Sequence, residues 1–279
     1  MIKHYYSLIK PGIIYGNIIT VSAGFFILGL RGPLYLYFLT LLGISLVMGC
    51  GCALNNLYDQ DIDRLMNRTK TRVLALGLIP CKYVIFYAVT LGIMGLLVLY
   101  FLVNPLTALV GFIGLFFYLC VYTYWLKRSS VLGTVVGGVA GSVPPVVGYC
   151  AVANQVDATA ISLFLILFIW QLPHAYAIAL YRFDDYKKAR IPVFPVIYGV
   201  RVTKLVMIFL VIAFIMSVSV PFFLGDKGWI YLFISQLLGF IWLFISIRAY
   251  FSSDNIIWGK KIFIFSIIVI FILCISLIL

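Results

Sequence analysis

The sequence predicts an all-α integral membrane protein with nine transmembrane helices, on three observations. Of its 279 residues, 65% are hydrophobic, and the mean hydropathy of +1.17 lies outside the range of soluble domains. Apolar runs of about 20 residues recur along the chain, which is the length of a bilayer-spanning helix, whereas a membrane β-barrel has short alternating segments. The basic residues fall almost entirely in every second connection between these runs.

The spans form one predicted domain, residues 1–279. We expect them at residues 13–30, 33–54, 82–101, 105–126, 131–152, 158–180, 203–224, 229–248 and 260–279. The first apolar run begins near Ile13 and is long enough to remain as a span, so we expect no cleavable signal. The six cysteines lie in or beside apolar runs without CxxC spacing and are interpreted as small buried hydrophobic residues.

The distribution of charge predicts the orientation. Of the 20 Lys and Arg residues, 18 fall on the side of the N-terminus, and only Arg31 and Lys227 fall on the other. The positive-inside rule therefore places the N-terminus in the cytoplasm and, with nine spans, the C-terminus outside. The net charge of +12 is spread over short loops and forms no basic domain or stripe, so we expect no nucleic-acid partner.

A polar segment follows the second span and reads NNLYDQDIDRLMNRTKTR, residues 55–72. On a helix, Asn55, Asp59 and Asp63 share one face within about 80°, while Asp61 points nearly opposite. Magnesium binds through one or two carboxylates and completes its shell with water and substrate phosphate. This row of oxygen ligands therefore predicts a site for a magnesium diphosphate.

Basic residues follow the acids directly and could hold the same phosphate oxygens: Arg64, Arg68, Lys70 and Arg72. The alternative is that these are ordinary cytoplasmic flanking charges with the aspartates as their solvated partners.

A second polar cluster follows the sixth span, in residues 170–190. If the helix continues past the membrane surface, His174, Tyr181 and Asp185 line one face, with Gln171 beside them and His174 about 16 Å deeper than Asp185. A histidine at that depth is a candidate functional group. The alternatives are an interhelical hydrogen bond for His174 and a salt bridge to Lys188 or Arg182 for Asp185.

Both polar clusters lie in long cytoplasmic loops, four spans apart. This recurrence predicts two four-helix halves in parallel orientation, with the ninth helix added. On the fifth predicted span, Gly133, Gly137 and Gly141 recur every four residues ahead of Pro144 and Pro145. We expect these glycines to let helices approach closely and the prolines to bend the span.

Three segments together resemble a known family. The first aspartate motif of the UbiA-type intramembrane prenyltransferases is similar to NNLYDQDIDRLMNRTKTRVLALGLI. Two further signatures resemble the protoheme IX farnesyltransferase branch of that family: WQLPHAYAIALYRFDDYKKARIPVFPVIYG and KRSSVLGTVVGGVAGSVPPVVGY. With the span count and orientation, the resemblance covers essentially the whole chain.

The resemblance implies helices around a central cavity open to the cytoplasm, Mg²⁺ as cofactor, and farnesyl diphosphate and haem B as substrates. By position it implies metal ligands at Asn55, Asp59, Asp63 and Asp185. The diphosphate ligands that it implies beside the first motif are Arg68, Lys70 and Arg72. Where the family often has DxxxD, this chain has Tyr181 four residues before Asp185, so the expected phosphate ligands there are Arg182, Lys187 and Lys188.

The implied reaction is ionisation of the allylic diphosphate, with Asp59, Asp63 and Asp185 as catalytic metal ligands, followed by attack of a haem vinyl group and addition of water. His174 would coordinate the haem iron or orient the porphyrin or water, in an acceptor site shared with Gln171 and Tyr181. The implied setting is a bacterial plasma (inner) membrane. A downstream haem-modifying enzyme or a terminal oxidase assembly would receive the product.

Other functions remain open at this point. A prenyltransferase acting on a quinone-precursor or chlorophyll-type acceptor would use the same diphosphate site. A secondary transporter would place charged or broken-helix sites near the bilayer midplane. A haem-binding scaffold would need no row of aspartates.

Overall fold

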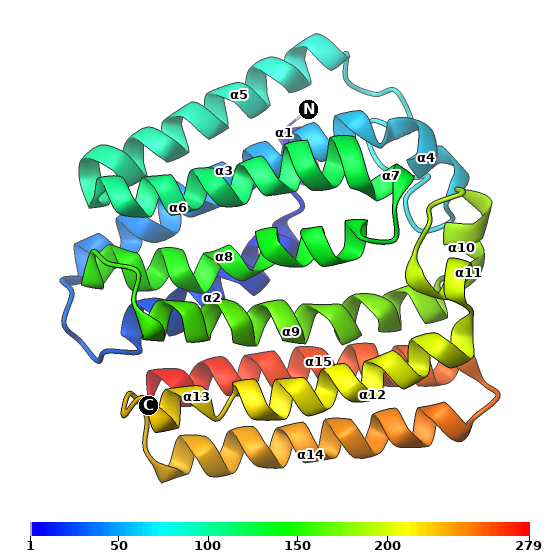
Figure 1. The fold of residues 1–279 in the computed structure, drawn as a ribbon. Helices are drawn as coiled ribbons and strands as arrows, with labels where there is room; N and C mark the ends of the chain where they lie inside the picture. Colours follow the sequence, from blue (N-terminus) through cyan, green and yellow to red (C-terminus); the bar gives the residue numbers. More distant parts are fainter. Residues whose placement is uncertain (1) are drawn as a thin grey trace.

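The computed structural model describes residues 2–279, and these are helical without any β-strand (Figure 1). In the first half the helices are α1 (Ile2–Leu8), α2 (Pro11–Phe26), α3 (Leu34–Tyr58), α4 (Gln60–Leu65), α5 (Cys81–Leu97), α6 (Pro105–Phe116), α7 (Lys127–Ser129) and α8 (Gly133–Ala153). Two π-helical segments, η1 (Val98–Val103) and η2 (Phe117–Leu126), extend α5 and α6. The second half contains α9 (Ala158–Tyr181), α10 (Phe183–Lys188), α11 (Phe194–Tyr198), α12 (Val200–Ser217), α13 (Val220–Phe223), α14 (Trp229–Phe251) and α15 (Asn255–Ile278).

Eight helical stretches among residues 2–279 are long and apolar enough to cross a membrane, which confirms a multi-pass helical membrane protein. Their bounds differ from the predicted spans by a few residues. The first predicted span, residues 13–30, corresponds to α2 alone. The helix α1, which was not predicted, is bent by 52° relative to α2, and the two make a ninth crossing if they count as one. The bend lies at Lys10, which is in the left-handed region (φ 51°) and precedes Pro11.

Small residues allow α2 and α8 to pack closely. A Cβ added to Gly24 would lie 1.9 Å from the carbonyl oxygen of Pro145, and one added to Gly148 would lie 2.1 Å from that of Val21. Only glycine fits at such contacts, so these positions fix the approach of α2 to α8. Neither Gly24 nor Gly148 belongs to the glycine row predicted from the sequence.

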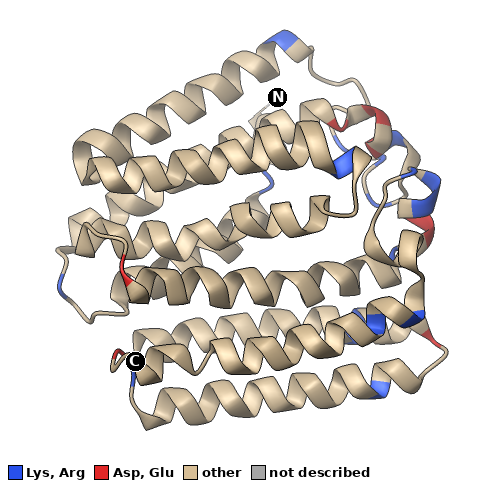
Figure 2. Cartoon of the chain, viewed as in Figure 1, with Lys and Arg blue, Asp and Glu red and all other residues tan. Residues whose placement is uncertain are grey.

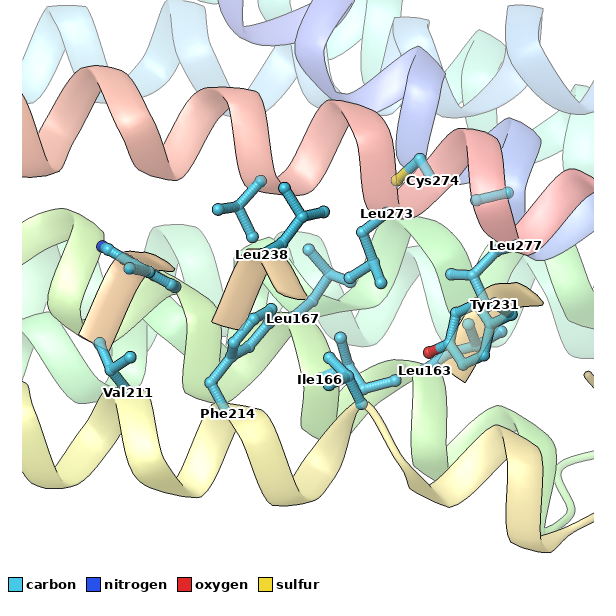
Figure 3. Packing of buried hydrophobic residues seen from close by; sticks show 14 of the residues in the cluster. Leu163, Ile166, Leu167, Val211, Phe214, Tyr231, Leu238, Leu273, Cys274 and Leu277 are labelled. Atoms are coloured by element: carbon cyan, nitrogen blue, oxygen red, sulfur yellow. The ribbon is translucent and has the colours of Figure 1, made fainter. Parts of the chain in front are cut away.

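The largest buried apolar cluster lies where α9, α12, α14 and α15 meet (Figure 3). Leu163 and Ile166 of α9 and Phe214 of α12 belong to this cluster, and the ring of Phe214 packs edge-on against the fully buried Trp242 of α14. Large apolar side chains elsewhere on the spans point outward and remain exposed, as expected for a surface in contact with lipid.

Acidic and basic residues gather at one end of the bundle, around α4, α7 and α10 (Figure 2). Both predicted polar clusters lie at this end. A small apolar cluster joins their two loops, in which Ile62 and Met66 pack against Ala189 and Ile191. The two loops therefore form one cap over the end of the bundle.

Candidate active site

Asn55, Asp59 and Asp63 are brought together in one buried row. The helix α3 ends at Tyr58, and Asp59 joins it to α4. The backbone N–H of Asp59 donates to the carbonyl of Asn55 (2.9 Å), and that of Asp63 donates to the carbonyl of Asp59 (2.8 Å). Because the i→i−4 pattern continues across the junction, the three side chains stay on one face. Their exposed fractions are 3%, 0% and 4%.

Each residue of the row accepts a hydrogen bond from a cation. The ammonium of Lys10 donates to Asn55 Oδ1 (2.6 Å), and Lys127 forms an ion pair with Asp59. Arg72 reaches both carboxylate oxygens of Asp63 (3.0 and 2.8 Å). A buried carboxylate without such a partner would be strongly destabilising, so the cations compensate the burial of the two aspartates.

Two of these three cations were not predicted as site residues from the sequence. Lys10 and Lys127 were counted only as cytoplasmic flanking charges, because each lies far from the aspartates in sequence. The only signal in the sequence is their position: Lys10 lies just before the first predicted span and Lys127 directly follows the fourth, both on the side of the aspartates.

Asp61 lies off this face, as predicted, and is exposed. Arg128 binds it with both terminal nitrogens at 2.7 Å and also lies 4.3 Å from the centre of the Tyr58 ring. The hydrogen bonds from Arg128 lower the pKa of Asp61 below its ordinary value. Arg128 thereby ties the end of the fourth predicted span to the loop that carries the aspartates.

A polar cavity of about 380 Å³, here called the polar chamber, opens beside the row. Four cations and one carboxylate line it: Lys10, Arg68, Arg72, Lys127 and Asp63. Such a balance of charge suits an anion with several negative charges.

The π-helical segment η2 supplies aromatic walls to the polar chamber. Its Tyr118 and Tyr122 stack with ring centres 5.8 Å apart, and both line the chamber. Thr123, in the same segment, accepts a hydrogen bond from the amide of Asn55 (3.1 Å). Isolated π-helical turns are common at functional sites, where they change the direction of side chains.

A second cavity of about 590 Å³, the apolar chamber, is lined mostly by hydrophobic side chains of α2, α3, α6, α8, α9 and α15. Four residues line both chambers: Ile13, Tyr118, Gly137 and Gln171. The two cavities therefore adjoin, and these residues mark the neck between them.

Gln171 has room at this neck because Gly141 faces it. A Cβ added to Gly141 would lie 2.0 Å from Gln171 Nε2 and 2.4 Å from its Oε1. All three glycines of the predicted row line the cavities, and Gly133 also allows the close approach of a neighbouring backbone, the carbonyl of Leu126.

His174 lines the apolar chamber and is held firmly. Its Nδ1 lies 2.7 Å from the hydroxyl of Ser266 on α15, so the interhelical hydrogen bond considered from the sequence is present. The imidazole stacks on Trp170, with ring centres 4.7 Å apart, and contacts Phe263. No residue among 2–279 hydrogen bonds to Nε2, which leaves that nitrogen available to a ligand.

His174, Tyr181 and Asp185 do not share a continuous helix face. The helix α9 ends at Tyr181, and Arg182 breaks it (φ −112°, ψ 23°) before α10 begins at Phe183. Tyr181 packs on Phe263 with ring centres 5.6 Å apart.

Asp185 lies at the same end of the bundle as Asp63. It is buried, with 5% exposed, and accepts a hydrogen bond from the backbone N–H of Asn67 (3.1 Å). This bond joins the two polar loops, which are 118 residues apart in sequence. Neither Lys188 nor Arg182 forms a salt bridge with it in the described residues.

The predicted site residues divide by position. Those that line the polar or apolar chamber are Asn55, Asp63, Arg68, Arg72, Gln171 and His174. Those that line neither are Asp59, Lys70, Tyr181, Arg182, Asp185, Lys187 and Lys188. Among the latter, Asp59 lies in the row itself, and Lys70 donates to Asn67 (3.1 Å) in the loop held by Asp185.

The oxygen atoms of the row suit Mg²⁺. Asp59 Oδ1 is buried without a hydrogen-bond partner in the described residues, so it has a free lone pair. Within residues 2–279 no three acidic, His or Cys side chains come close enough to hold an ion by themselves. A Mg²⁺ ion that takes one or two carboxylates and completes its shell with water and phosphate fits this arrangement.

The chain is similar to known proteins over nearly its whole length. The sequence profile of the UbiA prenyltransferase family matches residues 17–272. A protoheme IX farnesyltransferase of Yersinia pseudotuberculosis serotype O:1b (strain IP 31758) is 46% identical over 274 residues, covering 97% of this chain and 92% of the relative. Its counterpart in Photorhabdus laumondii subsp. laumondii is 45% identical over 272 residues, with the same coverage.

Solved structures have the same fold. A UbiA homolog from Archaeoglobus fulgidus bound to GPP and Mg²⁺ superposes with a TM-score of 0.76 at 19% identity, covering 99% of both chains. A digeranylgeranylglyceryl phosphate synthase reaches a TM-score of 0.82 at 19% identity, covering 99% of this chain and 97% of the other. Family profile, close relatives and fold agree over nearly the whole chain, which belongs to the UbiA prenyltransferase family and is a prenyltransferase.

Proposed function

We propose that the protein transfers the farnesyl group of farnesyl diphosphate to a vinyl group of protoheme IX (haem B), forming haem O with release of diphosphate. The observation that carries the proposal is the pair of adjoining cavities, one lined by cations and the other apolar. A prenyl diphosphate likewise consists of an anionic diphosphate and an apolar prenyl chain. The choice of haem as acceptor rests on the relatives named protoheme IX farnesyltransferase.

The diphosphate would lie in the polar chamber, against Arg68, Arg72 and Lys127. Arginine matches phosphate oxygens with paired N–H donors, and lysine adds a compact charge. Asn55, Asp59 and Asp63 would hold Mg²⁺, which supplies positive charge to the diphosphate oxygens when bound.

Asp185 supports this arrangement from the second loop. By holding the backbone of Asn67, it fixes the loop that carries Arg68 and Arg72 over the chamber. Lys70, Arg182, Lys187 and Lys188 belong to the two polar loops and remain proposed phosphate ligands.

The cations of the chamber favour departure of the diphosphate. As the allylic C–O bond breaks, its electron pair goes to the diphosphate, whose growing charge Lys127 and Arg72 stabilise. The apolar walls exclude water from the farnesyl cation, and the face of Tyr118 offers it a ring. The haem vinyl group then forms the new C–C bond, and water adds its oxygen to the resulting cation and releases a proton.

His174 and Gln171 would orient the acceptor in the apolar chamber. The Ser266 hydroxyl fixes the imidazole through Nδ1, so Nε2 can meet either the haem iron or a polar group of the porphyrin. Tyr181 lies behind, on Phe263, and would support the position of α15 beside the acceptor. We place the protein as a single domain in the bacterial inner membrane, with the N-terminus cytoplasmic and the C-terminus outside.

The test is to incubate the purified protein with farnesyl diphosphate, Mg²⁺ and haem B, and to follow the porphyrin by mass spectrometry. We expect haem O, which a downstream haem-modifying enzyme or oxidase would consume. Asp63→Asn should abolish the product, and Asp184→Asn, a change in an exposed acid of the other loop, is the matched control. Unmodified haem, together with prenylation of a quinone precursor, would refute the assignment of the acceptor.

A further inference from the structure

A third cavity, of about 410 Å³, lies behind the row of aspartates, between α1, the end of α3 and residues 71–78. Its polar lining comes from Lys3, His4, Ser7, Lys10, Asn56, Thr71 and Arg72. None of its lining residues is acidic. We call it the basic pocket.

The basic pocket shares a wall with the polar chamber. Lys10 and Arg72 line both cavities. These are also the cations that bind Asn55 and Asp63 of the row. The two cavities are therefore separated by two long, flexible, positively charged side chains.

Lys10 and Arg72, which line both cavities, each have N–H donors that are not used within the described part of the chain. Arg72 uses a single terminal nitrogen for both oxygens of Asp63, and its other two nitrogens have no hydrogen-bond partner among residues 2–279. Lys10 gives one of its three N–H groups to Asn55. Lys3 forms no ion pair with any described residue and is exposed at the outer side of the pocket.

We propose that the basic pocket is a second anion site, which receives inorganic diphosphate as it leaves the polar chamber. The proposal rests on the proposed function, which makes that anion the product. Arg72 and Lys10 can contact an anion on either side, so the diphosphate would change partners without losing all its charge-assisted hydrogen bonds. Lys3 and Thr71 would complete the set of donors at the outer side.

A phospholipid headgroup offers the same phosphate chemistry. The experiment therefore uses two lipid settings, with inorganic pyrophosphate as the probe. The full-length protein is placed in nanodiscs of either neutral phosphatidylcholine or anionic phosphatidylglycerol. The polar chamber is first filled with Mg²⁺ and farnesyl thiodiphosphate, a slowly reacting substrate analogue, and radiolabelled pyrophosphate is then added.

We expect one further equivalent of pyrophosphate to bind in both lipid settings. Lys3→Glu should weaken this binding by at least about tenfold, the effect of losing one charge-assisted hydrogen bond. Lys82→Glu, which changes an exposed lysine outside the pocket, should leave it unchanged. Lys3→Glu should also leave the binding of farnesyl thiodiphosphate unchanged, because Lys3 does not line the polar chamber.

Three results would overturn the proposal: no second equivalent of pyrophosphate, equal binding by the Lys3→Glu and Lys82→Glu proteins, or binding in phosphatidylcholine that disappears in phosphatidylglycerol. The last result would assign the pocket to a lipid headgroup. Failure of farnesyl thiodiphosphate itself to bind would instead count against the proposed function, so the two failures are distinguishable.

Discussion

Lys127 and Asp59 form the most buried ion pair of the site, and Lys127→Met removes one half of it. The exposed fractions of the two side chains are 16% and 0%. The substitution keeps the length of the side chain but leaves Asp59 with only the amide of Asn55 and with Arg128, whose nearest nitrogen is 3.7 Å away. The negative charge on Asp59 would then be poorly compensated.

Breaking a buried ion pair in this way costs ~3–5 kcal/mol when no other charge compensates. Because Arg128 and Asn55 remain near Asp59, we expect the lower part of that range or less, about 2–3 kcal/mol of unfolding free energy. For a chain of this size that corresponds to a fall of about 5 °C or more in the midpoint of thermal unfolding. Unfolding is followed in detergent by intrinsic fluorescence, with Lys82→Met as the control for an exposed lysine.

The double variant Asp59→Asn/Lys127→Met separates stability from function. Removing both charges should return the unfolding midpoint most of the way to that of the wild type, because no buried charge is left unpaired. Farnesyl transfer should stay absent, since a proposed metal ligand and a proposed diphosphate ligand are both gone. If the double variant is no more stable than Lys127→Met alone, Lys127 does not compensate Asp59 and the electrostatic reasoning fails.

Three further predictions concern the neck, the acceptor side and the metal. Gly141→Ala should displace the Gln171 amide, whose Nε2 would lie 2.0 Å from the new Cβ. We expect kcat/KM to fall by about tenfold, with little change in thermal stability. Activity equal to that of the wild type would show that this amide has no role. Ser266→Ala should free the imidazole of His174 and change the absorption spectrum of bound haem more than its affinity; an unchanged spectrum would show that the imidazole does not contact the haem. Removal of divalent metal by chelation should abolish farnesyl transfer, and added Mg²⁺ should restore the activity of the wild-type protein. The Asp63→Asn protein should stay inactive at any Mg²⁺ concentration. Transfer that persists without metal would refute the metal assignment.

The membrane fold is predictable from the sequence because its signals are local. Runs of about 20 apolar residues and the bias of basic loops each depend on neighbouring residues, and the observed spans lie close to the predicted ones. The bend between α1 and α2 was missed, because a short first helix and a left-handed Lys10 leave little trace in hydropathy.

The face of the first motif was also predictable, since Asn55, Asp59 and Asp63 lie within two helical turns of one another. The partners of these residues were not. Lys127 is 68 residues from Asp59, and Asn67 is 118 residues from Asp185. Such contacts follow from how the spans pack, which no local pattern encodes. The face proposed for the second motif failed at Arg182, where a break in the backbone outweighs helical spacing.

The pairing of the row with cations bears on how the proposed metal and substrate would bind. Mg²⁺ arriving alone at Asp59 and Asp63 would displace Lys127 and Arg72 from their carboxylates and leave two cations unpaired in a buried chamber. If diphosphate binds together with the metal, the diphosphate oxygens would pair with the displaced Lys127 and Arg72, and the carboxylates would bind the metal. Every charge then keeps a partner, so the geometry favours joint binding of Mg²⁺ and diphosphate over binding of either alone. The cations that now pair with the aspartates would in this way become the ligands of the leaving group.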